Sequence, residues 1–315
     1  DDSQPWAYNA IPLKNWVAAN PPEAKGAAIA VVPVVGTIVD GKARPGSAGG
    51  DTIAEHILDA ASDDGVKAIV LRVDSPGGSV LASEQIRQAL LVAKAKKLPI
   101  VVSMANVAAS GGYWVSTPAD RIFAEPETIT GSIGVFGILP SFDKTLAKIG
   151  VTTDGIRTTP LSGQPDILGG VNEEFNQLAQ AGVEDVYARF TGLVAKSRKQ
   201  PIEKIEAIAE GRVWAGGTAR QIGLVDQFGG LPDALAAAAK LAKVDGAFRA
   251  QYFEEEPSEW SKMLAAWTGA EQDETALAPR GWFGIAAMNR TLAERRLVQD
   301  MQMLTSSGSV QRSEE

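Results

Sequence analysis

Two glycine pairs constrain the fold of this chain most, because each stands between an apolar run of strand length and a helical pattern. The first pair is Gly77 and Gly78, and the second is Gly111 and Gly112. Glycine pairs usually mark tight turns, so each predicts a strand that turns abruptly into a helix. Strands that alternate with helices favour an α/β fold around a mostly parallel sheet.

The same alternation continues along the chain. The expected strands are Ala27–Val35, Lys67–Val73, Pro99–Met104, Ile122–Ala124 and Ile133–Leu139, with a strand end at Val151–Thr153. The expected helices are Asp51–Ala61, a helix capped by Ser79 that runs to Lys97, Phe142–Ile149, Asn172–Arg198, Pro201–Glu210, Gly216–Ile222 and Leu231–Lys243. Continuous apolar character predicts that the strand Lys67–Val73 is buried on both faces.

Composition shifts divide the chain into three parts. Residues 1–26 are rich in Pro, Asn and Ala and are interpreted as a linker or N-terminal extension. Residues 27–250 form the main unit, and residues 251–315 are predicted to be a variable tail that is partly helical or disordered. The chain starts without methionine and without a secretory signal, so we expect a processed product or a part of a longer chain.

Composition also excludes several functions. Hydrophobic residues make up 45% and charged residues 22%, and no stretch reaches the ~18 apolar residues of a membrane span. A formal charge of -8 without a basic stripe argues against a nucleic-acid partner. The chain has no cysteine and one histidine, which excludes thiol chemistry and makes a metal site improbable. We expect neither a metal nor a cofactor.

A nucleophilic serine is one interpretation of the second turn. Ser110 stands between the apolar strand and Gly111, so no bulky side chain blocks a carbonyl that approaches its hydroxyl. The N–H of Gly111 can bind the oxyanion that such an attack forms. The turn at Gly77 and Gly78 can supply a second donor to the same pocket. The alternative is that both turns only shape the chain.

A serine nucleophile needs a base, and the single histidine is a poor candidate. His56 stands in the middle of the predicted helix Asp51–Ala61, two elements before the serine. We therefore assign it a surface or packing role. The other candidate is a lysine whose pKa is lowered by burial, because a neutral amine can accept the serine proton.

Six stretches together carry a resemblance to a known family. They are Arg72–Ser79, Val102–Met104, Ala108–Trp114, Thr128–Gly134, Glu210–Trp214 and Gly223–Asp226. Over about residues 28–257 the chain resembles the signal peptide peptidase A (protease IV) family. The resemblance implies a Clp protease/crotonase-like fold of repeated ββα units with C-terminal helices. It also implies a serine endopeptidase that degrades remnant signal peptides and other unfolded apolar peptides.

The resemblance assigns roles to individual residues. Ser110 would be the nucleophile, and the N–H groups of Gly78 and Gly111 would form the oxyanion hole, with Gly77 allowing the turn. Ser132 would orient a general-base lysine. The alternatives are that Gly77 only shapes its turn and that Ser132 only caps a strand end.

Three apolar residues after this segment are candidates for the substrate pocket. They are Val135, Phe136 and Ile138, and core packing is the alternative for all three.

The general-base lysine is missing from its expected place. Short family members carry it in a segment that corresponds to Ser162–Ile167, yet no lysine occurs between Lys148 and Lys196. Lys144 and Lys148 are expected on the solvated side of their helix. Double-length members carry the lysine in a first copy of the unit and the serine in a second. This chain resembles the second copy, so we expect the lysine from an N-terminal half, in the same polypeptide or an adjacent chain.

The resemblance further implies a homo-oligomer, with a tetramer suspected. It also implies a place on the periplasmic face of the bacterial inner membrane, with the anchor outside this chain.

Two other functions stay open. One is a crotonase-type acyl-CoA enzyme, which shares the oxyanion geometry but uses carboxylate bases. The other is a non-catalytic half that binds peptides or assembles rings.

Overall fold

The computed structural model describes residues 11, 15–16, 19–20, 26–44 and 46–254. Its strands are β1 (Ala27–Val35), β2 (Thr37–Val39), β3 (Ser47–Gly49), β4 (Val66–Ser75), β5 (Ile100–Ala109), β6 (Arg121–Ala124), β7 (Ile129–Gly131), β8 (Val213–Ala215), β9 (Gln227–Phe228) and β10 (Phe248–Tyr252). Its helices are α2 (Gly50–Ser62), α3 (Val80–Ala95), α4 (Gly111–Ser116), α5 (Asp143–Lys148), α6 (Glu173–Arg198), α7 (Ile202–Glu206), α8 (Gly216–Gln221) and α9 (Leu231–Leu241).

One sheet organises these elements. Its strands follow the order β10-β1-β4-β5-β6-β9, and all neighbours in that order are parallel. β7 runs parallel to the end of β5 and pairs antiparallel with β8. The expected α/β class with a mostly parallel sheet and C-terminal helices is confirmed.

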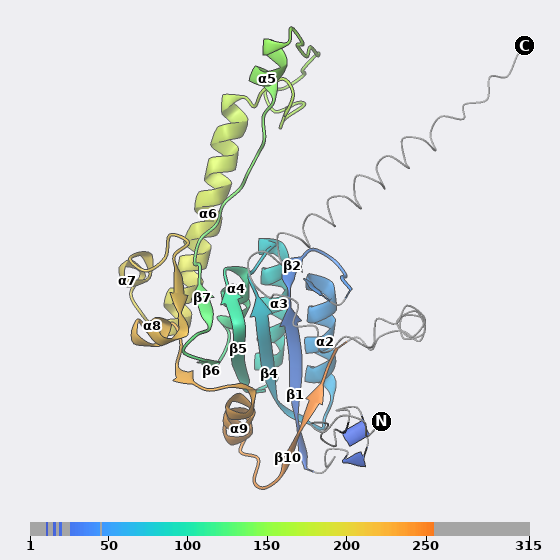
Figure 1. Cartoon of the computed structure of the whole chain (residues 1–315), viewed down its shortest axis with the longest axis vertical. Coiled ribbons are helices and arrows are strands. Elements are labelled where there is room, and N and C mark those ends of the chain that lie inside the picture. The colour runs from blue at the N-terminus through green and yellow to red at the C-terminus, as the bar shows by residue number, and fades with distance from the viewer. Residues whose placement is uncertain (1–10, 12–14, 17–18, 21–25, 45, 255–315) are drawn as a thin grey trace, which may run out of the picture. The chain divides into compact units, whose positions relative to one another are not determined.

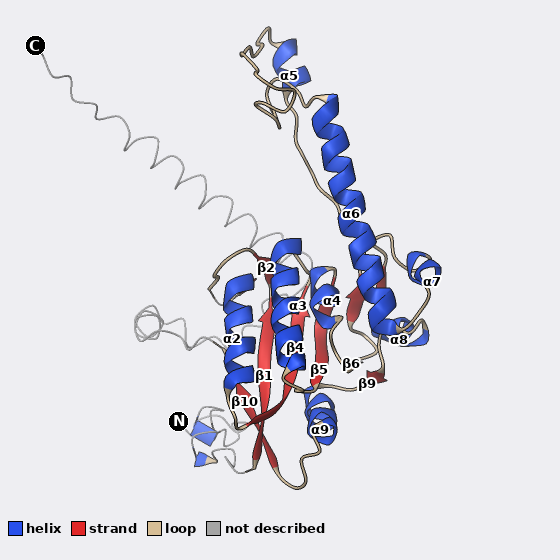
Figure 2. Ribbon diagram, turned by 180° about the vertical axis from the view of Figure 1, so that it is seen from behind, coloured by secondary structure: helices blue, strands red, loops and turns tan. Residues whose placement is uncertain are grey.

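Both faces of the sheet are covered, as the apolar character of its strands predicts. Ile69, Leu71 and Val73 of β4 belong to the core that includes residues of α2, α3 and α4. Ala68 and Val70 point the other way and join a smaller core with α9. This alternation follows from the two-residue period of a strand, and Figure 2 shows α2 and α3 side by side on one face.

Two predicted strands are wrong. Ile133–Leu139 forms no strand, because after one hydrogen bond from Gly211 to Ile133 this segment leaves the sheet and no further strand among the described residues pairs with it. The strand that does form here, β7, ends two residues earlier. Val151–Thr153 is likewise an exposed loop. The expected helix Pro201–Glu210 is shorter than predicted, because α7 ends at Glu206.

An arm formed by the segment after β7, with α5 and the first part of α6, extends from the sheet. Figure 1 shows α5 beside the end of α6 that lies far from the strands. Asn172, where the helix was predicted to begin, caps α6, because its side chain accepts a hydrogen bond from the N–H of Phe175 (2.9 Å). At the other end of α6, Phe190 and Val194 are buried in the main core.

The contacts divide the chain into two units, Asp1–Glu255 and Glu256–Glu315. β10 (Phe248–Tyr252) pairs with β1, so this strand of the sheet crosses residue 250. The division into 1–26, 27–250 and 251–315 stays a prediction, and most of both end segments lies outside the described residues. Among the described residues, no helix is both long and apolar enough to cross a membrane.

Candidate active site

Ser110 stands in a strained backbone conformation between β5 and α4. Its φ is 51° and its ψ is -118°, a region that L-residues rarely occupy. The turn is held on both sides, because the Ser110 N–H donates to the Gly131 carbonyl (2.9 Å) and the Ser110 carbonyl accepts from Tyr113 and Trp114. Its hydroxyl has no hydrogen-bond partner among the described residues. Strain of this kind is retained where the surrounding structure enforces it, most often at functional sites.

The turn after β4 is fixed by β2. The Ile38 N–H donates to the Gly77 carbonyl (2.9 Å), and the Ile38 carbonyl accepts from the Ser79 N–H (2.9 Å). Within the turn, the Gly77 N–H donates to the Ser75 hydroxyl (3.1 Å). The Gly78 N–H, between these fixed groups, has no partner in the described part of the chain. A donor is thereby prepared before any ligand arrives.

The two glycine turns meet at Ser110. A Cβ built on Gly77 would lie 2.6 Å from the Gly111 nitrogen and 2.8 Å from the Ser110 Cβ. A Cβ built on Gly111 would lie 3.2 Å from the Gly78 nitrogen. The Gly111 N–H, at the start of α4, also has no partner among the described residues. The structure thus brings together Ser110, Gly77, Gly78 and Gly111, as predicted.

A cavity of about 10 Å³ lies at this point, which is room for about one water. Its lining consists of Gly78, Val80, Ser83, Ser110, Gly111, Trp114, Gly134, Val186 and Phe190. A serine hydroxyl and two N–H donors around such a cavity can attack a carbonyl and hold the resulting oxyanion. A crotonase-type enzyme would need a carboxylate base here, and none of these lining residues is Asp or Glu.

Ser132 lies on the neighbouring strand end. Gly131 pairs with Ala109 in the sheet, so the residues that follow each of them are adjacent. Ser132 has a φ of 50°, and its N–H donates to the Arg212 carbonyl (2.7 Å). Its hydroxyl has no partner among the described residues. Ser132 therefore fits a role in orienting a base, although its role stays a prediction.

The stretch Glu210–Trp214 explains how that position is held. The Gly211 N–H donates to the Ile133 carbonyl (3.0 Å), and β8 pairs with β7. A Cβ on Gly134 would lie 2.7 Å from the Gly211 nitrogen, so the two backbones are in direct contact. This stretch clamps the segment that carries Ser132.

The structure adds a side of the site that the sequence did not predict. Trp114 lines the cavity, and its ring centroid lies 4.8 Å from that of Phe190 on α6. Its indole N–H donates to the Glu84 carboxylate (2.9 Å). Burial opposes ionisation of Glu84, but hydrogen bonds from Arg87, Gln88 and Trp114 outweigh it and lower its pKa to about 2. Val186 and Phe190 are spaced one helical turn apart, a signal that could have indicated this face.

No base for Ser110 stands in its cavity, because the lining includes neither lysine nor histidine. His56 lies in α2, which packs on α3, β1 and β4, in agreement with a packing role. Lys144 and Lys148 are exposed on α5, as predicted. Among the described residues, the lining of this cavity thus holds a serine and two unpartnered N–H groups but no lysine or histidine.

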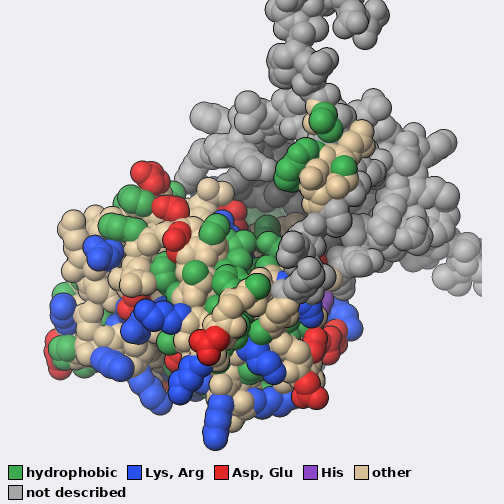
Figure 3. Space-filling model, turned by 90° about the horizontal axis from the view of Figure 1, so that it is seen from below, with side chains coloured by type: hydrophobic (Ala, Val, Ile, Leu, Met, Phe, Trp, Pro, Cys, Tyr) green, Lys and Arg blue, Asp and Glu red, His purple; other side chains and the backbone are tan. Residues whose placement is uncertain are grey.

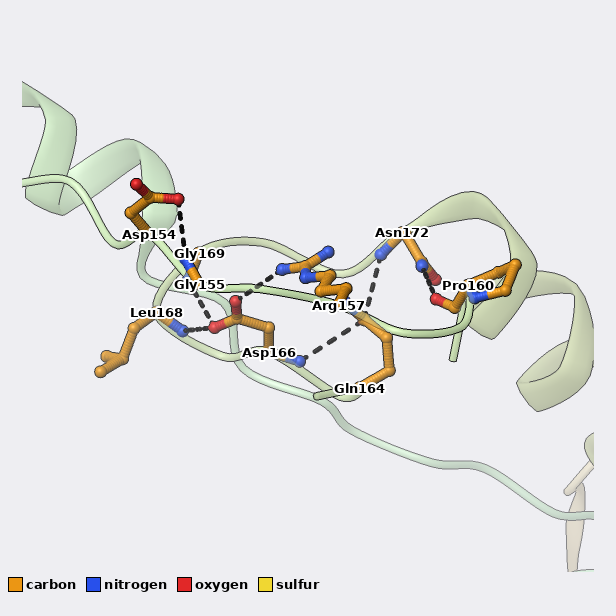
Figure 4. A network of polar contacts seen from close by, with 9 residues as sticks. All are labelled: Asp154, Gly155, Arg157, Pro160, Gln164, Asp166, Leu168, Gly169 and Asn172. Atoms are coloured by element: carbon orange, nitrogen blue, oxygen red, sulfur yellow. Dashed lines mark hydrogen bonds and ion pairs between the residues drawn. The ribbon is translucent and has the colours of Figure 1, made fainter. Parts of the chain in front are cut away.

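The segment Ser162–Ile167, where the family resemblance places the lysine of short members, belongs to the arm. Figure 4 shows the polar contacts that hold it. The Asp166 carboxylate pairs with Arg157 (3.0 Å), and the Gln164 side-chain oxygen accepts from the Asn172 N–H (3.2 Å). Asn172 marks the start of α6, at the end remote from the sheet.

The three residues predicted to line a substrate pocket lie at the root of the arm. Phe136 is 85% exposed and Ile138 is 84% exposed, so core packing is wrong for both. Val135 is half-buried. None of the three lines the cavity at Ser110. Their role in binding substrate stays a prediction.

The fold and site define an α/β protein in which a strained serine lies beside two unpartnered N–H groups, and comparisons with known proteins relate the chain to peptidases. A model of the family described as "Peptidase family S49" matches residues 92–245. Protease 4 of Salmonella typhi is 46% identical over 263 residues, which cover 84% of this chain and 42% of that protein. Protease 4 of Haemophilus influenzae is 44% identical, over 68% of this chain and 34% of that protein. The chain belongs to peptidase family S49.

Two further matches extend the comparison. "Serine protease SPPA, chloroplastic" of Arabidopsis thaliana is 35% identical, over 69% of this chain and 32% of that protein. Among solved structures, a ClpP1 mutant from Listeria monocytogenes matches with a TM-score of 0.42 and 17% identity, over 65% of this chain and 94% of that chain. The chain spans less than half the length of the Protease 4 relatives and of the Arabidopsis relative.

Proposed function

We propose that this chain is the serine-bearing half of a peptidase in which Ser110 attacks the peptide carbonyl. The observation that carries the proposal is the strained Ser110 beside the N–H groups of Gly78 and Gly111, none of which has another partner among the described residues. Ser110 would form an acyl-enzyme, the two N–H groups would bind the oxyanion, and water would release the product.

The general base in this proposal is a neutral lysine from an N-terminal half, in the same polypeptide or in an adjacent chain. It would take the Ser110 proton and return it to the leaving amine. Ser132 would hold its amine in line. Two observations support an outside source: the cavity lining contains no lysine, and the chain matches 42% of the length of the Salmonella relative, the extent expected of one half.

The arm adds a geometric reason for an outside base. The segment where short family members carry the lysine contacts Asn172, at the start of α6. Phe190, which packs at the site, lies 18 residues further along the chain. That separation corresponds to about 27 Å of helix. A lysine placed in the arm would therefore not reach Ser110 of its own chain.

The substrates in this proposal are remnant signal peptides and other unfolded apolar peptides. An open groove of about 770 Å³ runs between α3 and α6 and shares Val80, Trp114 and Val186 with the cavity at Ser110. Apolar residues such as Leu81, 70% exposed, and Leu193 also line it. A groove of this size and character suits apolar side chains of an extended peptide.

We extend the proposal to the protein's place in the cell: a homo-oligomer on the periplasmic face of a bacterial inner membrane, anchored by a segment outside this chain. The Protease 4 relatives come from the bacteria Salmonella typhi and Haemophilus influenzae, which supports a bacterial location. The exposed apolar residues of the arm, such as Ile149 (71%) and Ile156 (100%), support contact with a neighbouring subunit.

Cleavage of a fluorogenic apolar peptide by the full-length protein tests the proposal. Ser110→Ala should lower the cleavage rate at least about a thousandfold, because removing a nucleophile abolishes the covalent route. Ser62→Ala, an exposed serine on α2, is the matched control and should leave the rate unchanged. A folded Ser110→Ala protein that retains more than a tenth of the activity would overturn the proposal.

A further inference from the structure

A second hollow lies at the edge of the sheet opposite Ser110, where the parallel strands begin. Its volume is about 1080 Å³, and the ends of α3 and α6 and the start of β6 contribute to its lining. β5 begins beside it and ends at Ser110, so ten residues, or about 33 Å of strand, separate the two places. This basic hollow is therefore remote from Ser110, although Arg87, Leu193 and Lys196 also line the groove between α3 and α6.

The lining of the hollow is positively charged, whereas the chain as a whole is negatively charged. Its lining includes seven Lys or Arg residues and two Asp residues, whereas the whole chain has a formal charge of -8. Figure 3, which looks onto the lower end of the molecule in Figure 1, shows Lys and Arg side chains spread over this face. Such a local concentration of positive charge raises the local concentration of anions.

Both acidic residues of the hollow are already paired. Asp120 pairs with Lys94 (2.8 Å), and Asp226 pairs with Arg198. They therefore do not neutralise the remaining lysines. Lys97, Lys196 and Lys199 line the same hollow, and their ammonium groups have no hydrogen-bond or ion-pair partner within the described ranges.

Two of these lysines occupy strained positions. Lys97 and Lys199 follow the ends of α3 and α6 with φ values of 65° and 53°, where glycine is the least strained residue. Lys243 repeats the pattern after α9, with a φ of 54°, and lines an adjoining hollow that also includes Lys97. Three helices thus end on strained lysines at one face.

The helix dipoles do not account for the pattern. A lysine near a helix carboxyl terminus is favourable, but Lys94, Lys196 and Lys240 already stand in the last turns of α3, α6 and α9. Glycine after each helix would remove the strain and leave those favourable charges in place. Compensation of the helix dipoles therefore does not explain why lysine stands at these strained positions.

We propose that the basic hollow binds phosphate groups, borne by an anionic phospholipid or by a soluble phosphate compound. A phosphate concentrates up to two negative charges and several acceptor oxygens on one centre, which suits several unpaired ammonium groups. Leu91, Leu98 and Leu193 stand among the lysines and offer apolar surface next to the charge. The Ser197 hydroxyl, buried and without a partner among the described residues, is a further donor at the same place.

Binding of the 315-residue chain to two probes tests the proposal. One probe is vesicles of phosphatidylcholine with and without phosphatidylglycerol, and the other is inorganic pyrophosphate in solution. The variant Lys97→Gln, Lys196→Gln, Lys199→Gln should bind the preferred probe roughly a hundredfold more weakly, since each lysine near an anionic surface contributes about a factor of five. Preference for phosphatidylglycerol vesicles identifies a lipid ligand, and preference for pyrophosphate identifies a soluble one.

The matched control is Lys144→Gln, Lys148→Gln, Lys204→Gln, which removes the same charge from other exposed sites. It should bind within about twofold of the unchanged chain. Equal losses in both triple variants, or no binding of the unchanged chain to either probe, would overturn the proposal.

A second variant separates a ligand role from a role in folding. Lys97→Gly with Lys199→Gly should raise the midpoint temperature of unfolding, because it relieves two strained positions, and should weaken binding of the same probe. A double glycine variant that is less stable than the unchanged chain would mean that these lysines serve the fold, and the proposal would fail.

Discussion

Ser110, Ser132 and Gly77 are held in backbone conformations that ordinary residues avoid. Their φ values are 51°, 50° and 100°. Each is enforced by hydrogen bonds from a neighbouring strand or turn, so the cost, about 1–3 kcal/mol for each non-glycine residue, is carried by the surrounding sheet. The site is therefore prepared by the backbone before a substrate binds.

The close contact behind Ser110 leads to a prediction at Gly77. In Gly77→Ala the new Cβ would meet the Gly111 nitrogen at 2.6 Å, at a φ where alanine is already strained. We expect acylation of Ser110 to fall at least about a hundredfold, the typical effect of losing an oxyanion donor, and stability to fall by about 1–3 kcal/mol. Probe labelling and urea unfolding measure the two effects.

Gly46→Ala is the matched control for Gly77→Ala. Gly46 has nearly the same φ, 103°, but nothing lies within 4 Å of its added Cβ. It should lose about 1 kcal/mol of stability from strain alone and keep full labelling of Ser110. Similar labelling in both alanine variants would contradict the role given to Gly77.

Local signals explain which site residues could be predicted from the sequence. The sequence predicted the two turns at the site because a tight turn depends on the residues within it. These turns contain Gly77, Gly78, Ser110 and Gly111. Phe190 was not predicted, because it reaches the site from a helix that begins more than sixty residues after Ser110. Such packing across long sequence separation leaves no local pattern.

Three helices meet at the site through one tryptophan. Trp114 of α4 packs on Phe190 of α6 and donates to Glu84 of α3. Arg87 donates to both oxygens of the Glu84 carboxylate (2.7 Å each), one of which also accepts from Trp114. The ionised carboxylate therefore links α3 to the helix that begins at Ser110.

This link predicts a pH dependence of stability. The pKa of Glu84 is about 2 in the folded chain and about 4.5 when unfolded, so its contribution is fully present above pH 4.5 and is lost as pH falls towards 2. Because the side chain is 33% exposed, we discount the contribution to about 1 kcal/mol. Urea unfolding should show the stability difference between the unchanged chain and Glu84→Gln shrinking by that amount over this range.

Glu55→Gln is the control for that titration. Glu55 pairs with Lys42 at 3.0 Å on the surface, with its side chain 57% exposed. An exposed ion pair of this kind contributes little, so Glu55→Gln should change the free energy of unfolding by well under about 1 kcal/mol. A stability difference for Glu84→Gln that does not change with pH would contradict the link between α3 and α4.

The elements themselves were largely predictable, with an instructive failure. The helix α6 was predicted to its ends because Asn172 caps it and its apolar positions repeat at helical spacing. The predicted strand Ile133–Leu139 failed because an apolar run makes a strand only where a neighbour pairs with it. β7, with three residues, was too short for its periodicity to be recognised.

On the scale of the whole molecule, the sheet separates two kinds of chemistry. Ser110 and the N–H groups of Gly78 and Gly111 lie at the carboxyl ends of the strands, where parallel sheets usually bind ligands. The strand beginnings at the amino edge carry the basic hollow with Lys97 and Lys199. β5 runs from one edge to the other, between Pro99 at the hollow and Ser110 at the cavity.

The membership in peptidase family S49 and the missing base lead to one central claim: Ser110 is a nucleophile completed by a lysine from an N-terminal half. The described residues supply the strained serine and the donors. The lining of the Ser110 cavity supplies no lysine. The chain alone should therefore fold but react slowly.

Mass spectrometry of the chain after exposure to a fluorophosphonate probe tests this claim most directly. The chain would be measured alone and together with the N-terminal half, with Ser110→Ala as the control. We expect one adduct, on Ser110, that forms only when both halves are present. Rapid labelling of Ser110 in the chain alone, or no labelling when both halves are folded together, would contradict it.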